Sequence, residues 1–365
     1  AILELIENKE RVDFYTVINK LPRDEYVKNG EYLIKIAIAV PLLSKFENYC
    51  EALIEAYKIR QLSNISEEIT MESNTLKSDE IIKNLNNRIK EIEDACKFSK
   101  TESIQEVLVK MIDELENKDP NGVETGIKEF PKFYNSDLIF LAARPGVGKT
   151  SLALNIAANV ARRHKVAFFS LEMSNLQLSY RLLSSDCGIP VRKFIERDLT
   201  QDNWLKLLIS ADSFHDYDLF ISDVYNTTID EIKSSIVALG GVKFAVIDYL
   251  QLVRPETQSF NKVYEVSEIT RKLKMMAKEL DIPILCLSQL SRASEQRNDH
   301  KPLLADLRDS GSIEQDADVV MLLYRPYMYD KEASPNECEC IVAKNRHDMT
   351  KTFSLEFNGE LTRFS

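Results

Sequence analysis

The residues with the clearest chemical meaning lie in the segment AARPGVGKTS, residues 142–151, which follows an apolar run and precedes a helical pattern. Glycine lets backbone N–H groups approach phosphate oxygens, and the start of a helix favours anions through its dipole. Lys149 adds a positive charge for the β and γ phosphates, and the Thr150 hydroxyl is a ligand for Mg²⁺. The segment predicts a phosphate-binding loop, although Ala143 stands where the pattern GxxxxGKS/T begins with glycine. Its candidate nucleotide-binding residues are Arg144, Pro145, Gly146, Val147, Gly148, Lys149, Thr150 and Ser151.

Hydrolysis of a bound triphosphate needs one carboxylate aimed at the attacking water and another that holds the metal. Glu172 follows a second apolar run and is the candidate base, and Asp248 follows another run and is the candidate Mg²⁺ ligand. Gln289 ends a further apolar run, where its amide is suited to sense the γ-phosphate. Each residue alone is also compatible with a solvated polar group that ends a strand. Their shared position after apolar runs, in a chain with a phosphate loop, favours the catalytic interpretation.

The elements that must position these residues are short apolar runs typical of buried parallel strands. Such runs cover residues 138–142, 166–171, 219–222, 244–247 and 282–287. Helical patterns such as 151–162 and 265–280 separate most of them, which predicts an α/β fold with a doubly wound, mainly parallel sheet. Ligands of such sheets bind beyond the carboxyl ends of the strands. Four later runs come without intervening helices and predict antiparallel additions: 319–324, 338–343, 352–357 and 361–364.

The first third of the chain has a helical pattern instead. Apolar residues recur at helical spacing in 2–6, 32–57 and 81–92, and an amphipathic pattern over 101–118 ends at the turn signal DPNG. We expect a partial all-helical N-terminal domain over 1–66, a helical linker over 67–120 with one or two helices, and the α/β domain over 121–365. The chain starts at Ala1 inside a helical pattern, so we expect the natural protein to extend further at this end.

Composition excludes several classes of protein. With 44% hydrophobic and 29% charged residues over 365 positions, the chain is typical of a folded protein of more than one domain. It has no apolar run long enough to cross a bilayer and no secretion signal, so we expect a cytoplasmic protein without membrane contact. The six cysteines are scattered without a CxxC pair, which predicts reduced thiols and no zinc site.

The net charge of −11 argues against a broad nucleic-acid-binding surface. Acidic residues are concentrated in the first 120 positions, which hold 24 acidic and 17 basic side chains. Any DNA contact is therefore expected from a few loops later in the chain.

The α/β part contains a series of sequence motifs that are similar to those of a known family: AARPGVGKTSLALNIA, FFSLEMS, VIDYLQL, LSQLSRASEQR, LRDSGSIEQDADVVMLLYR and AKNRHD. In this order they closely resemble the RecA-like motor domain of the DnaB-type replicative DNA helicases. The resemblance covers roughly residues 122–365, and DLRDSGSIEQDAD is its most specific motif. The helical front part and linker resemble the N-terminal domain of that family more weakly.

The resemblance implies a homohexameric ring that hydrolyses ATP with Mg²⁺ at subunit interfaces. Such a ring moves along single-stranded DNA, unwinds forked DNA, and works with a primase and a helicase loader. Residue by residue, it assigns Lys149 and Thr150 to the phosphate loop, Glu172 to the catalytic glutamate, and Asp248 to the second acidic motif. It assigns Gln289 to the motif that links nucleotide to DNA loops.

The resemblance also places Arg181 near the nucleotide, and it matches Lys344 and Arg346 to a basic pair that reaches into the neighbouring subunit's site. A guanidinium suits that task because its fixed fork can neutralise charge on the γ-phosphate oxygens. Without the resemblance, Lys344 and Arg346 would be interpreted as exposed charges at a strand end.

For DNA, the family pattern points to Arg308, Asp309 and Gly311. A motor that moves along any sequence holds phosphates rather than base edges, and one arginine with free backbone N–H groups can do so. The sequence departs from the family at His347-Asp348, where Asn-Gly is usual, and in the shorter, glycine-poor segment 126–135.

Two other classes of function remain open at this point. One is a RecA-like recombination or regulatory ATPase that acts on DNA without separating strands, and the other is an interaction protein with an inactive nucleotide site. The helical front part and the word DLRDSGSIEQDAD favour the helicase over the first. The joint presence of Lys149, Glu172, Asp248 and Arg346 argues against the second.

Overall fold

The computed structural model describes residues 46–72, 77–95, 103–117, 121–128, 130–255, 262–307 and 311–365. Contacts divide the chain into two units, with the division between Asp113 and Glu114. The expected helical pattern 2–6 and the first part of 32–57 lie outside the described residues.

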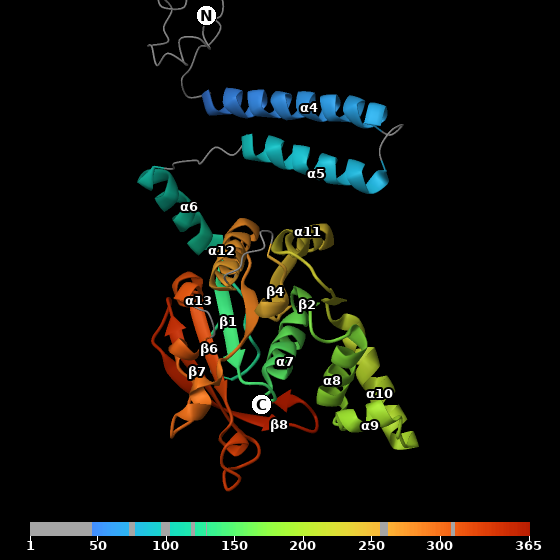
Figure 1. The fold of residues 1–365 in the computed structure, drawn as a ribbon, viewed down its shortest axis with the longest axis vertical. Coiled ribbons are helices and arrows are strands. Elements are labelled where there is room, and N and C mark those ends of the chain that lie inside the picture. Colours follow the sequence, from blue (N-terminus) through green and yellow to red (C-terminus); the bar gives the residue numbers. More distant parts are fainter. Residues whose placement is uncertain are drawn as a thin grey trace, which may run out of the picture. The chain divides into compact units, whose positions relative to one another are not determined.

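In the N-terminal unit, helices α4 (Phe46–Glu72) and α5 (Ser78–Ala95) pack against each other, as Figure 1 shows. Ile65 of α4 is buried, and Arg88 of α5 pairs with Glu68 of α4 at 3.5 Å between Nη2 and Oε2. A third helix, α6 (Ile104–Asn117), follows. Helix α4 passes residue 66 without interruption, and the division of the front part into 1–66 and 67–120 stays a prediction.

The second unit is built on one sheet, whose described strands follow the order β3-β2-β4-β5-β1-β6-β7-β8-β9. Strands β1 to β6 run parallel, and β7, β8 and β9 add antiparallel strands at one edge. The expected doubly wound α/β fold is confirmed. The strands are β1 (Leu138–Ala143), β2 (Lys165–Ser170), β3 (Leu219–Asp223), β4 (Val242–Asp248), β5 (Ile284–Gln289), β6 (Val319–Tyr324), β7 (Glu337–Asn345), β8 (Lys351–Asn358) and β9 (Arg363–Phe364). The helices are α7 (Lys149–Ala161), α8 (Asn175–Cys187), α9 (Val191–Glu196), α10 (Gln201–Ser213), α11 (Ile229–Leu239), α12 (Lys262–Leu280) and α13 (Gly311–Asp316).

One predicted strand orientation is wrong. We expected residues 319–324 to add to the sheet in antiparallel fashion, but β6 runs parallel to β1 with Ile139 opposite Val319. The chain between β5 and β6 returns to the amino end of the sheet through short helical turns and α13, so it forms a parallel crossover. No long apolar helix marks this crossover in the sequence. The other expected late strands are antiparallel, as predicted.

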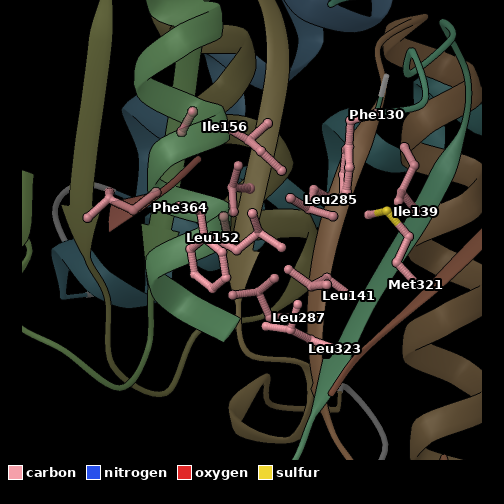
Figure 2. Close-up of a cluster of buried hydrophobic side chains, with 14 of the residues drawn as sticks. Phe130, Ile139, Leu141, Leu152, Ile156, Leu285, Leu287, Met321, Leu323 and Phe364 are labelled. Atoms are coloured by element: carbon pink, nitrogen blue, oxygen red, sulfur yellow. The ribbon is translucent and has the colours of Figure 1, made fainter. Parts of the chain in front are cut away.

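Burial on both faces of the sheet explains the uninterrupted apolar runs. Alternate residues of β1 point to opposite sides, so Leu141 joins one core cluster and Phe140 joins another. The first cluster contains Leu152 and Ile156 of α7 and is drawn in Figure 2. The second is covered by side chains of α11, α12 and α13. The two cores hold the carboxyl ends of the parallel strands in one row.

None of the described helices is both long and apolar enough to cross a bilayer. In the part of the chain that the structure describes, Cys187, Cys286, Cys338 and Cys340 form no disulfide.

Candidate active site

The loop between β1 and α7 has the backbone shape that a phosphate site needs. Gly146 and Gly148 both adopt positive φ angles, +79° and +115°, which suit glycine. A Cβ atom at Gly148 would lie 3.0 Å from Phe364 Cζ and 3.3 Å from Phe357 Cζ, so a side chain at this position would crowd both rings. Helix α7 begins directly after it, at Lys149. The predicted order of strand, glycine loop and helix is therefore present.

Arg144, the first candidate of this loop, is held by the segment after β5. Its Nε donates to Glu295 Oε1 at 2.8 Å, and its Nη1 donates to the Leu290 carbonyl at 2.8 Å. The side chain thus ties the loop to its neighbour in the sheet. A contact of Arg144 with a nucleotide stays a prediction, as do those of Pro145, Val147 and Ser151.

Thr150 and Asp248 meet at the centre of the site. The Thr150 hydroxyl donates to Asp248 Oδ2 at 2.7 Å, and the Asp248 side chain is completely buried. The other oxygen, Asp248 Oδ1, is buried without a hydrogen-bond partner. Burial raises the pKa of Asp248, although the Lys149 charge opposes this. A carboxylate oxygen that accepts no hydrogen bond, beside a hydroxyl, fits a divalent cation such as Mg²⁺.

Among the described residues, no group of three or more His, Cys, Asp or Glu side chains is placed to hold a metal ion. A pair of protein oxygens is the arrangement that Mg²⁺ takes beside phosphates, since it keeps water and phosphate oxygens as its remaining ligands. The Thr150 and Asp248 oxygens therefore fit a Mg²⁺ ion that also binds nucleotide phosphates.

Lys149 lies next to this pair in a mostly buried position. Its Nζ is 3.9 Å from Asp248 Oδ1 and 4.5 Å from the centre of the Tyr249 ring, and 13% of the side chain is exposed. Burial lowers the pKa of Lys149, and the charges of Asp248 and Glu172 oppose this shift. A desolvated ammonium at a helix start is suited to bind phosphate oxygens. Tyr249, directly after Asp248, is not among the site residues predicted from the sequence.

Glu172 reaches the same region because β2 pairs with β4. Ser170 lies opposite Asp248 in that pairing, and Leu171 N donates to the Asp248 carbonyl at 2.7 Å. The Glu172 side chain is exposed beyond the strand end. Burial lowers the pKa of Arg181 in α8, and the charges of Asp248 and Glu172 partly oppose this shift. The structure thus brings Glu172 and Asp248 within electrostatic reach of both Lys149 and Arg181.

Gln289 is the last residue of β5 and lies opposite Ala143 of β1, the residue before the phosphate loop. Its backbone N donates to Gln251 Oε1 at 3.4 Å, and Gln251 Nε2 donates to Ser288 Oγ at 3.0 Å. Gln251 therefore links the end of β5 to the turn after β4. Sequence reasoning missed this residue, because a single glutamine after an apolar run carries no distinctive spacing.

Lys344 and Arg346 lie at the amino edge of the sheet, the row where the parallel strands begin. The phosphate loop lies at the carboxyl edge, the row where these strands end. Strand β7 runs antiparallel to β6, so its end at Asn345 pairs with Val319, the first residue of β6. The phosphate loop follows the other end of the parallel strands. Within one chain, these two basic residues and the phosphate loop are therefore not brought together.

Of the expected DNA-contacting residues, Arg308 and Asp309 lie outside the described residues. Gly311 begins α13, and a Cβ atom added there would meet no heavy atom within 4 Å. Gly311 therefore lies in open space.

The phosphate loop after β1, the acidic residues Glu172 after β2 and Asp248 at the end of β4, and the parallel sheet define a RecA-like nucleotide hydrolase. The family model described as DnaB-like helicase C terminal domain matches residues 122–365. The replicative DNA helicase DnaC of Bacillus subtilis (strain 168) and the replicative DNA helicase DnaB of Geobacillus stearothermophilus are each 37% identical to this chain over 385 residues. Each alignment covers 100% of this chain and 85% of the relative.

A solved structure of a DnaB-like replicative helicase, described with its interactions with primase, is 31% identical with a TM-score of 0.76. It covers 99% of this chain and 89% of that chain. The chain therefore belongs to the family of DnaB-type replicative DNA helicases, and it is an enzyme that uses a nucleotide.

Proposed function

We propose that this chain is the subunit of a hexameric replicative helicase that hydrolyses ATP to move along single-stranded DNA and to unwind forked DNA. The observation that carries the proposal is the division of basic and acidic groups between two edges of one sheet. Lys149, Glu172 and Asp248 stand at the carboxyl edge, and Arg346 stands at the amino edge. An active site that needs all four groups is complete only where two subunits meet, as in a ring with head-to-tail interfaces.

In this proposal the phosphate loop and Lys149 bind the β and γ phosphates of ATP. Thr150 and Asp248 hold Mg²⁺, which would neutralise charge on the phosphate oxygens when bound. Glu172 accepts a proton from the attacking water, and Gln289 senses the γ-phosphate beside the end of β1. Arg181 contributes a second positive charge from α8, in reach of both carboxylates.

The neighbouring subunit supplies Arg346, and with it Lys344, to the developing negative charge of the transition state. A preorganised guanidinium is effective there because it stabilises charge that grows as the γ-phosphate is transferred. Hydrolysis at each interface would then depend on the contact between two subunits, which couples the chemistry to movements of the ring.

For DNA, we propose that Arg308, Asp309 and Gly311 form a loop that contacts phosphates. We also propose that residues 1–66 form a partial N-terminal domain and that residues 67–120 form a linker. We also propose a cytoplasmic enzyme that works with a helicase loader and with a primase; the primase is supported by the solved structure of a DnaB-like replicative helicase described with its interactions with primase. The second candidate, a RecA-like ATPase without strand separation, is disfavoured by the family match over 122–365 and by relatives that are replicative helicases along the full chain.

The test is unwinding of a forked duplex labelled on one strand, measured with and without ATP and Mg²⁺. We expect strand release only with both, and six-fold rings in negative-stain images of the same sample. The Lys149→Ala variant serves as the control, because it lacks only the side chain that is proposed to bind the phosphates. Hydrolysis stimulated by single-stranded DNA without release of the strand would favour the second candidate.

A further inference from the structure

The two basic residues at the amino edge are held by one short helix. Lys344 Nζ donates to the carbonyls of Glu314 and Ala317, each at 2.6 Å. Arg346 Nη2 donates to the Gln315 carbonyl at 3.0 Å. The Glu314 and Gln315 carbonyls lie in the last turn of α13 and the Ala317 carbonyl lies directly after it, where the carbonyl groups of a helix end favour cations. Burial lowers the pKa of Lys344, and the neighbouring Arg346 charge lowers it further.

Asp318 holds Arg346 at two points. Its Oδ1 accepts from Arg346 Nη1 at 3.1 Å, and its carbonyl accepts from the Arg346 backbone N at 3.0 Å. The Asp318 side chain is 5% exposed, while that of Arg346 is 50% exposed. The arginine is therefore fixed on one side and open to another molecule on the other.

The second oxygen of Asp318 is fully used within the unit. Asp318 Oδ2 accepts from the Leu138 backbone N at 2.8 Å and from Lys274 Nζ at 2.5 Å, and Lys274 Nζ also donates to the Ser136 carbonyl. This carboxylate is thus anchored to the first residue of β1 and to α12. A charge fixed in this way can orient a guanidinium more sharply than a mobile surface partner can.

We propose that Asp318 is the positioning residue of Arg346: it fixes the guanidinium, with α13 behind it, in the orientation in which it enters the neighbouring subunit's nucleotide site. This inference rests on the proposed role of Arg346 across the subunit interface. Asp318 does not touch the nucleotide itself. Asp318 sets the direction of the Arg346 guanidinium. A displacement of a catalytic group by about 1 Å can lower the reaction rate about 100-fold.

A neighbouring carboxylate provides a matched control. Asp137, directly before β1, is also buried, but its Oδ1 pairs with His347 Nε2 at 2.8 Å instead of with Arg346. The His347 ring lies against Tyr134, with 4.7 Å between the ring centres. Asp137→Asn therefore removes a buried charge from the same edge without removing an Arg346 contact.

The experiment is a subunit-mixing assay with Asp318→Asn. The variant should lose about 10-fold to 100-fold in kcat for ATP with KM nearly unchanged, since the phosphate loop of its own subunit stays intact. Mixed with Glu172→Gln subunits, it should regain activity, because about a quarter of the interfaces in random rings then carry both intact sides. Mixed with Arg346→Ala subunits, it should regain none, because every interface lacks a correctly placed arginine.

The opposite pattern would overturn the inference. If Asp318 only supports β1 and the phosphate loop of its own subunit, recovery appears with Arg346→Ala and is absent with Glu172→Gln. Full activity of an assembled Asp318→Asn variant, or an equal loss in Asp137→Asn, would overturn it as well. The reference mixture of Arg346→Ala with Glu172→Gln separates the two proposals: if it fails to recover in proven mixed rings, the role of Arg346 across the interface is itself wrong.

A folding defect can be bypassed with Asp318→Glu, which keeps the charge but moves the carboxylate by one methylene group. Ring assembly is checked by size-exclusion chromatography before each assay. We expect Asp318→Glu to recover with Glu172→Gln and not with Arg346→Ala. Recovery with Arg346→Ala alone would overturn the inference for this variant too.

Discussion

The Thr150 hydroxyl lies 2.7 Å from Asp248 Oδ2, although 98 residues separate the two in sequence. This hydrogen bond joins the first turn of α7, directly after the phosphate loop, to the last residue of β4. It leaves Asp248 Oδ1 buried and without a hydrogen-bond partner. The pair therefore presents a hydroxyl and a carboxylate side by side, and we propose that they hold the Mg²⁺ ion of a bound nucleotide.

Lys149→Ala should abolish hydrolysis and weaken ATP binding together. The ammonium is the charge that the loop directs at the phosphates, and the substitution also leaves Asp248 beside Glu172 without its nearest cation. Binding is measured with a fluorescent ATP analogue and turnover by phosphate release. Unchanged affinity in Lys149→Ala would contradict the assignment.

Glu172→Gln should keep nucleotide affinity while kcat falls, because the amide conserves shape but cannot accept a proton. General base catalysis contributes about 100-fold to 10,000-fold, and a loss in this range is expected. The same fluorescent analogue serves as the probe. A parallel fall in affinity, as in Lys149→Ala, would mean that Glu172 binds the nucleotide and does not act as the base.

Arg346→Ala should lower ATP turnover at every interface while each subunit still binds nucleotide through its own phosphate loop. The physical reason is that Arg346 lies at the amino edge of the sheet, whereas the phosphate loop of the same subunit lies at the carboxyl edge. ATPase activity of a one-to-one mixture with Glu172→Gln subunits should exceed that of either variant alone. Absence of recovery, with both variants shown in the same rings by mass spectrometry, would count against action across the interface.

Arg308→Ala should weaken binding of single-stranded DNA by a similar factor for every sequence. Loss of one phosphate contact should also reduce the salt dependence, by roughly 0.7 in the slope of log K against log salt for each contact. Affinities for two unrelated oligonucleotides at several salt concentrations provide the measurement. Weaker binding with an unchanged slope would show that Arg308 shapes its loop, by pairing with Asp306 or Asp309, and does not touch phosphate.

Leu287→Ala should destabilise the motor unit by about 2–5 kcal/mol, because it opens a cavity in a packed core. Leu287 is completely buried on β5 in the cluster of Figure 2. Chemical denaturation followed by circular dichroism gives the shift in midpoint. Leu208→Ala on α10, where 62% of the side chain is exposed, is the control and should change stability by less than about 0.5 kcal/mol. Equal shifts in both variants would contradict the core assignment.

Much of the fold was predictable because buried parallel strands need apolar residues on both faces. The runs at 138–142, 166–171, 219–222, 244–247 and 282–287 all became strands of the expected sheet. The orientation of β6 was not predictable from its own residues, VVMLLY, which would suit either direction. Direction depends on the path of the preceding chain, and the short elements between β5 and β6 have no strong periodic pattern.

The types of group in the site were determined by the sequence alone, since local spacing around Gly146, Gly148 and Lys149 defines a phosphate loop wherever a strand and a helix flank it. The contact of Thr150 with Asp248, and the approach of Glu172, were decided by the strand order, which sets β2 beside β4 and β1 between β5 and β6. The tertiary structure also decided that Arg346 stands apart from its own phosphate loop and rests against Asp318. Local sequence sets backbone propensity and chemistry, whereas only the pairing of distant strands sets the distances between side chains.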